Sequence, residues 1–99
     1  MKITVLTAAI DDLESGRLFY QQQGEHLGDY FLDSLFSDID SLIVYAGIHQ
    51  QVFGYYRMLA HRFPYAIYYK MPKPDEVVVW RVLDMRAKPA KTVKSLKST

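Results

Sequence analysis

Four arginines in the second half of the chain are the side chains best suited to hold an anion. They are Arg57, Arg62, Arg81 and Arg86. A guanidinium group is always charged, and its planar fork of N–H donors matches a phosphate or a carboxylate. Because all four belong to one stretch of strand-like sequence, we expect them to converge on one side of a sheet and to bind a target or a phosphate group there.

Arg81 is the most unusual of the four, because it interrupts an apolar run. Two interpretations stand side by side: it pairs with a carboxylate such as Asp84, or it faces a concave basic site. Trp80 and the tyrosines of this region could stack on nucleic-acid bases. The same residues are also typical of a strand whose aromatic side chains pack in a core.

Histidines are the other candidates for chemistry, since imidazole titrates near neutral pH. His26, His49 and His61 all lie in segments that read as loops. No two of them have the i, i+4 spacing of a helical zinc site, and the chain has no cysteine. We therefore expect no metal site and no cofactor. Acid–base work by His49 or His61 and simple exposure to solvent both remain open.

A β-hairpin must position the arginines. β-branched and aromatic residues dominate residues 55–70 and 77–86. Between them, Pro72-Lys73-Pro74-Asp75 is expected to end the first strand and form the turn. The run from Val77 to Leu83 is almost continuously apolar, which predicts a central strand buried on both faces.

Two amphipathic helices precede the hairpin, over residues 8–23 and 27–45. Their apolar residues repeat at helical spacing, and Gly47 is a stop signal. A short connection between them predicts an antiparallel helical hairpin that covers one face of the sheet. With a short first strand at residues 2–6, residues 1–99 form a single α+β domain of order β-α-α-β-β-β. We expect an antiparallel sheet and a basic C-terminal tail, either a short helix or solvated chain, carrying Lys88, Lys91, Lys94 and Lys97.

The charge of the chain is divided between its halves. The net charge is +1 over 99 residues, but residues 1–50 carry two basic and eight acidic side chains, and residues 51–99 carry ten basic and three acidic ones. This division predicts an acidic or polyanionic partner for the second half. No apolar run approaches the roughly 20 residues needed to span a bilayer, so we expect no membrane contact and a cytoplasmic protein.

The order and spacing of several short sequence motifs resemble those of the RelE/ParE superfamily. This superfamily comprises toxins of bacterial type II toxin–antitoxin modules. The resemblance extends over nearly the whole chain, and no single motif is diagnostic by itself. The motifs in the second half are Tyr56-Arg57-Met58-Leu59, Arg62-Phe63-Pro64-Tyr65-Ala66-Ile67-Tyr68-Tyr69 and Val79-Trp80-Arg81-Val82-Leu83-Asp84-Met85-Arg86-Ala87-Lys88-Pro89. In the first half they are Asp12-Leu13 with Phe19-Tyr20, and Leu27-Gly28 with Phe31 and Leu35.

The resemblance implies one of two activities: cleavage of mRNA, usually on the ribosome, or poisoning of DNA gyrase. Arg57, Arg62 and Arg86 match basic positions of the superfamily. Ala66 stands where the ribonuclease branch often has arginine, and Asp84 stands where many members have histidine. A general acid is therefore missing, which favours a ParE-like toxin that binds gyrase. The alternatives are a metal-independent endoribonuclease that uses His61 or Asp84, and a degenerate toxin that only binds its antitoxin.

A cognate antitoxin is the partner that the resemblance implies. Antitoxins of this superfamily wrap the toxin with an extended segment, so we expect an oligomeric complex. An acidic segment would suit the basic second half, and aromatic residues left at the surface would supply apolar contacts.

Overall fold

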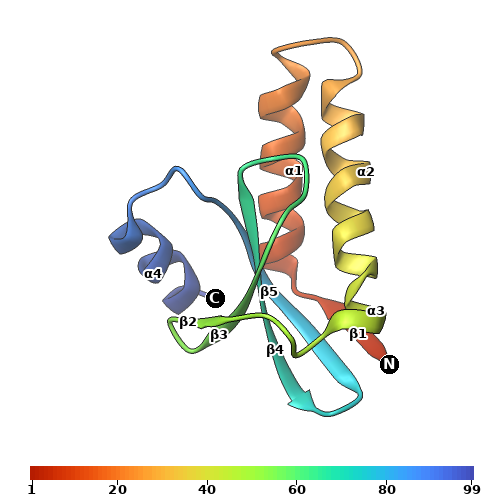
Figure 1. The fold of residues 1–99 in the computed structure, drawn as a ribbon. Helices are drawn as coiled ribbons and strands as arrows, with labels where there is room; N and C mark the ends of the chain where they lie inside the picture. Colours follow the sequence, from red (N-terminus) through yellow and green to blue (C-terminus); the bar gives the residue numbers. More distant parts are fainter.

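A five-stranded sheet lies between a helical hairpin and a short C-terminal helix in the computed structural model, which describes residues 1–99 (Figure 1). The sheet has the strand order β1-β5-β4-β3-β2. The elements in chain order are β1 (Lys2–Val5), α1 (Thr7–Gln21), α2 (Leu27–Asp40), α3 (Leu42–Tyr45), β2 (Gln51–Val52), β3 (Tyr55–Leu59), β4 (Tyr65–Lys73), β5 (Glu76–Asp84) and α4 (Pro89–Lys97).

The α+β architecture is confirmed, and the sheet is mixed. β2, β3, β4 and β5 form an antiparallel meander, with one strand more than the three that the sequence predicts after the helices. β1 pairs with β5 in parallel, Lys2 opposite Glu76 and Val5 opposite Val79. Parallel strands need a long crossover connection, and here the helices together with three strands supply it. Local sequence carries no signal for the direction of this last pair.

The run that is buried on both faces is the first half of β4, and the prediction that β5 is such a strand is wrong. Residues 65–69 are all buried, whereas burial alternates along β5. β5 lies between β1 and β4, but β1 ends beside Val79 and leaves the second half of β5 at the edge. Pro72 also lies within β4, where a turn was expected. The register shifts between Lys70 and Lys73, and such an irregularity tolerates a residue without an N–H.

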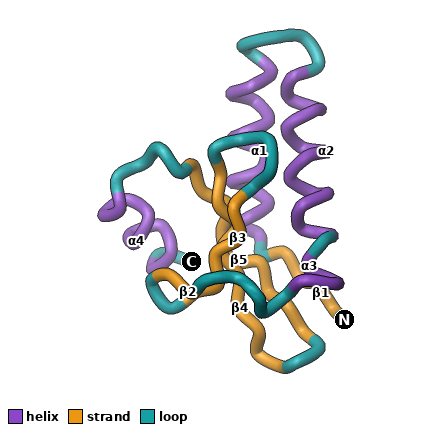
Figure 2. Tube along the Cα trace, in the orientation of Figure 1, coloured by secondary structure: helices purple, strands orange, loops and turns teal.

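Both predicted helices cover the same face of the sheet, and the hairpin extends beyond its edge (Figures 1 and 2). The apolar stripes face inward as expected, and Phe31 and Leu35 are fully buried. The second helix is interrupted at Ser41, whose hydroxyl donates to the carbonyl oxygen of Asp38. Such a bond to the preceding turn competes with the helical pattern. No helix is long and apolar enough to cross a membrane.

Gly16 lets the two helices approach each other. A Cβ atom at this position would lie 2.4 Å and 2.5 Å from two ring atoms of Phe31, which is buried among other aromatic rings. A methyl group there would force the ring off its position.

A Gly16→Ala variant is therefore expected to be less stable by about 1–2 kcal/mol. Alanine gains up to about 1 kcal/mol of helix propensity over glycine, and overpacking costs about 1–3 kcal/mol. Urea unfolding followed by circular dichroism measures the difference. The exposed neighbour provides the control, since Ser15→Ala should be neutral or slightly stabilising. A Gly16→Ala chain as stable as that control would show that Phe31 moves freely.

The opposite face of the sheet is covered by α4, so the basic tail contains a helix. Leu96 packs against Ala66 and Tyr68 in a second, smaller core. The Trp80 indole N–H donates to the carbonyl oxygen of Leu96 at 3.1 Å, which satisfies one free carbonyl at the helix end. The four lysines of this segment are exposed and form no ion pair within the chain.

Candidate functional site

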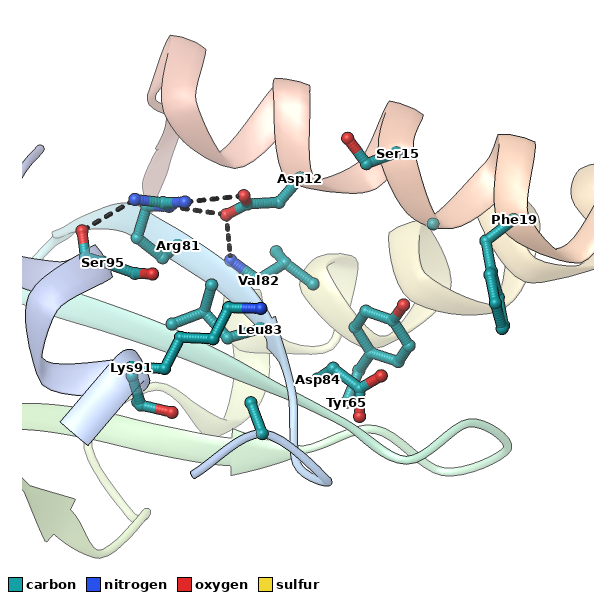
Figure 3. A pocket seen from close by; sticks show the side chains of 13 residues that line it. Asp12, Ser15, Phe19, Tyr65, Arg81, Val82, Leu83, Asp84, Lys91 and Ser95 are labelled. Atoms are coloured by element: carbon teal, nitrogen blue, oxygen red, sulfur yellow. Dashed lines mark hydrogen bonds and ion pairs between the residues drawn. The ribbon is translucent and has the colours of Figure 1, made fainter. Parts of the chain in front are cut away.

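A hollow of about 340 Å³ lies between α1, the free end of β5 and α4 (Figure 3). It combines cations, carboxylates and a phenol, so it is a candidate site for binding or proton transfer. Its lining residues are Asp12, Ser15, Gly16, Phe19, Tyr65, Arg81, Val82, Leu83, Asp84, Ala87, Lys91, Thr92 and Ser95.

Arg81 at one end of the hollow is fully engaged. Its Nε and Nη2 donate to the two carboxylate oxygens of Asp12 at 2.7 Å and 2.8 Å, and its Nη1 donates to the carbonyl oxygen of Ser95 at 2.7 Å (Figure 3). Asp12 also accepts the backbone N–H of Val82 at 3.0 Å, at the point where β5 has lost its partner β1. Hydrogen bonding to Asp12 raises the pKa of Arg81 further. One ion pair thus joins α1, β5 and the C-terminal end of α4.

Of the two interpretations of Arg81, pairing with a carboxylate is observed, but the partner is Asp12 and not Asp84. The carboxylate of Asp84 binds Arg86 instead, accepting Nε at 3.0 Å, Nη2 at 2.7 Å and the backbone N–H at 2.8 Å. These bonds to Arg86 lower the pKa of Asp84 and raise that of Arg86. Asp84 is therefore a carboxylate at neutral pH and has no proton to give.

Tyr65 contributes a phenol to the same hollow. Burial, and then the negative charge of Asp84, raise its pKa to about 12. The hydroxyl group is consequently protonated at physiological pH and is a poor general base. Tyr65 can donate a hydrogen bond to a bound group, and Lys91 lies on the α4 side of the hollow (Figure 3).

The register places Arg57 and Arg81 on the same face of the sheet, since both lie opposite Tyr68, but the four arginines differ in their partners. Arg57 lies on β3 opposite Tyr68 and borders a small hollow that it shares with Asp84. Arg62 is exposed in the turn between β3 and β4. Neither Arg57 nor Arg62 has a carboxylate partner, whereas Arg81 and Arg86 do.

His61 is held by a carboxylate from another element. Its Nδ1 lies 2.5 Å from an oxygen of Asp38 on α2, and its backbone N–H donates to the other oxygen at 3.1 Å. The Asp38 side chain is 6% exposed and the imidazole 72%, so a buried acid orients an exposed ring.

His49 and His61 line the same groove, between α3 and the edge of β3, together with Arg57. His49 Nδ1 lies 2.6 Å from the hydroxyl of Tyr69, and burial lowers its pKa. His26 is exposed in the loop between the helices. No group of three or more metal-binding side chains occurs.

Asp12 is a site residue that the sequence analysis did not identify as a candidate. Its position next to Leu13 and between Ala9 and Gly16 was the available signal. Those three residues belong to the buried stripe of α1, together with Tyr20, so Asp12 borders the stripe, whereas Asp11 is exposed. Tyr65 carried no local signal, because the burial that shifts its pKa depends on distant elements.

Comparisons with known proteins agree with this fold. The family described as ParE toxin of type II toxin-antitoxin system, parDE, matches residues 3–89. A solved structure described as the chromosomal ParDE TA system from P. aeruginosa is similar with a TM-score of 0.76 and 16% sequence identity, over 87% of this chain and 97% of that chain. A search of curated proteins gives no significant match. At 16% identity the structural likeness shows a shared fold, while the family match extends over most of the sequence. The chain therefore belongs to the ParE toxin family of type II toxin–antitoxin systems.

Proposed function

We propose that this chain is the growth-inhibiting toxin of its module, that it acts by binding DNA gyrase in the cytoplasm, and that a cognate antitoxin neutralises it in an oligomeric complex. Family membership supports the toxin class. The choice of gyrase over RNA rests on one observation: at the free end of β5, the pKa of Asp84 is lowered and the pKa of Tyr65 is raised to about 12.

RNA cleavage needs a base for the 2′-hydroxyl and an acid for the leaving oxygen, and both work best with a pKa near the operating pH. Asp84 is held as a carboxylate by Arg86, with its pKa lowered. Tyr65 has a pKa of about 12. Arg81 is neutralised by Asp12, so it is not free to hold a phosphate. This end of the sheet supports binding better than proton transfer.

Arg57 and Arg62 are the arginines we propose as target contacts, because neither has a carboxylate partner within the chain. Arg86 remains a candidate, since its side chain is 57% exposed although Asp84 binds it. We assign Arg81 a structural role instead.

A supercoiling assay with purified gyrase tests this proposal. The protein is expected to inhibit gyrase, and an Arg57→Ala/Arg62→Ala variant should inhibit it at least tenfold less, since each lost charged contact contributes about 1.5–3 kcal/mol. Arg17→Ala is the matched control, because Arg17 lies on α1 and pairs with Glu14. An unaffected gyrase, in a strain whose growth the protein arrests, would contradict the proposed target.

A second candidate function is a metal-independent endoribonuclease, and the Asp38–His61 pair favours it. A carboxylate that fixes Nδ1 leaves Nε2 of His61 free, in a groove that also contains His49 and Arg57. RNA cleavage in the presence of a chelator, lost in His61→Ala and kept in His26→Ala, would establish this function in place of the first. Asp84 is a poorer candidate, because its bonds to Arg86 keep it ionised.

A degenerate toxin is the third alternative from the sequence. It would bind its antitoxin yet leave growth, supercoiling and RNA unaffected. Induction of the chain alone, followed by separate measurements of DNA damage and of translation, distinguishes all three functions.

A further inference from the structure

The charged side chains of α4 and of the segment that leads into it are all positive. A lysine stands at every third position, and no acidic residue occurs between Met85 and Thr99. These lysines form what we call the lysine stripe: Lys88, Lys91, Lys94 and Lys97. All four are exposed, and none forms an ion pair within the chain. Their charge is therefore available to a partner.

The stability of the helix does not account for the lysine stripe. Cations stabilise the C-terminal end of a helix, where Lys94 and Lys97 lie, but they are unfavourable at the N-terminal end. Lys88 is the N-cap residue, Lys91 lies in the first turn, and no acidic residue accompanies them there. Lysines three positions apart also repel one another. A bound polyanion would relieve this repulsion.

The carboxylates of the chain do not neutralise the stripe. In the hollow beside α4, Asp12 binds Arg81 and Asp84 binds Arg86, so each carboxylate already has its cation. Residues 7–40, which form the helical hairpin, carry eight acidic side chains and one basic one, and the hairpin covers the other face of the sheet (Figure 1). A polyanion would be repelled by the hairpin and attracted by α4, and it would meet the chain in one orientation.

Lys70 extends the positive surface from α4 onto the sheet. Its Nζ lies 4.7 Å from the ring centre of Tyr55 and 4.5 Å from that of Trp80. Two aromatic faces thus hold the ammonium group in place. Because the Trp80 indole also binds the carbonyl oxygen of Leu96, Lys70 lies near the C-terminal end of α4.

The chemistry of the stripe indicates which polyanion fits. Lysine is a flexible point charge, which suits contacts with phosphates better than the recognition of bases. A helix of nine residues is about 14 Å long, and one strand of duplex DNA presents about four phosphates over that length. A helix that binds a membrane surface buries its apolar side in the lipid, but Leu96 already packs against the sheet. Duplex DNA therefore fits α4 better than a lipid surface does.

We propose that the lysine stripe binds the phosphates of duplex DNA, independently of base sequence, when the chain acts on gyrase. The choice of DNA rests on the proposed function, because duplex DNA is the substrate that gyrase holds. The chain then contacts the enzyme and its bound DNA together, with the acidic helical hairpin directed away from the DNA.

A salt series measures the phosphate contacts. Fluorescence anisotropy of a labelled duplex gives the affinity of the purified chain, and log K falls against log salt with a slope of about −0.9 for each phosphate contacted. Lys88→Gln/Lys91→Gln should make that slope shallower by about 2 and weaken binding at least about tenfold at about 0.1 M salt. Two duplexes of unrelated sequence should bind equally, since phosphate contacts carry no sequence information.

Lys2→Gln/Lys73→Gln is the matched control. It removes the same charge beside Glu76, at the end of β5 away from the Trp80 contact with α4, and it should keep the wild-type slope. Equal losses in the two double variants would show that only net charge matters, which overturns the stripe as a site. Tighter binding to single-stranded RNA, or binding to vesicles that contain phosphatidylserine in place of DNA, would overturn the choice of ligand.

A thermal melt of the free chain tests whether the lysines are structural instead. Because the helix dipole disfavours cations at Lys88 and Lys91, Lys88→Gln/Lys91→Gln is expected to melt at or slightly above the wild-type temperature. A clearly lower melting temperature would show that these lysines stabilise α4, which contradicts a role in binding.

The supercoiling assay separates this inference from the proposed function, because DNA binding is measured without gyrase. If gyrase is inhibited but Lys88→Gln/Lys91→Gln binds DNA with the wild-type slope, the inference fails and the proposed function stands. If the wild-type chain binds DNA through the stripe but leaves gyrase unaffected, the proposed function fails and the DNA site stands.

Discussion

A Val79→Asp variant is expected not to fold. Val79 is completely buried in the core between β5 and the helices, and it pairs with Val5 of β1. A carboxylate there has no partner, and burying an unpaired charge costs several kcal/mol even after the group takes up a proton. A domain of this size has only about 5–15 kcal/mol of stability in total.

Circular dichroism and a thermal melt measure this outcome. Val44→Asp makes the same chemical change at a side chain that is 74% exposed, and it should melt within a few degrees of the wild type. A cooperative melt of Val79→Asp at the temperature of that control would mean that β5 is not an interior strand.

An Asp12→Ala variant is expected to lose about 2–4 kcal/mol of stability. The substitution leaves the Arg81 guanidinium, which is 16% exposed, without its anion, and it leaves the N–H of Val82 without an acceptor. Arg81 also holds the last turn of α4 through Ser95. The loss should therefore appear both as a melting temperature lowered by about 10 °C or more and as faster proteolysis of α4.

Asp11→Ala provides the control for that prediction. Asp11 is the adjacent carboxylate on α1 but is exposed and makes no side-chain hydrogen bond or ion pair, so its loss should change stability by less than about 0.5 kcal/mol. Equal melting temperatures for the two variants would show that water or another group replaces Asp12 at Arg81.

The helical hairpin and the β3–β4–β5 meander could be predicted because their determinants are local. Leu13, Phe31 and Leu35 repeat at the helical period, and Tyr65 to Tyr69 combine strand-forming residues with a nearby turn. The interruption of the second helix at Ser41 was not predicted, because it depends on a side chain that bonds to the preceding turn, and periodicity does not reveal such a bond.

The site could be predicted only in part, because its geometry depends on contacts between distant residues. Its position within an apolar run identified Arg81 as unusual, and the sequence suggested Asp84 as a partner. The partner is Asp12, which local sequence could not indicate because β5 is placed against α1 by the fold. The same holds for His61, whose loop position indicated exposure while its buried partner Asp38 comes from α2. Short-range spacing identifies the groups able to pair, and the sheet topology decides which of them meet.

The parallel pairing of β1 with β5 determines when this chain can fold during its synthesis. β1 is made before both long helices, and its partner strand is made after them and after three further strands, as Lys2 opposite Glu76 shows. Contacts between residues so far apart form late, after the local hairpin of α1 and α2. A nascent chain interrupted before β5 has neither the partner of β1 nor the arginine that Asp12 binds. Translation products that stop before β5 should therefore remain incompletely folded and open to proteolysis.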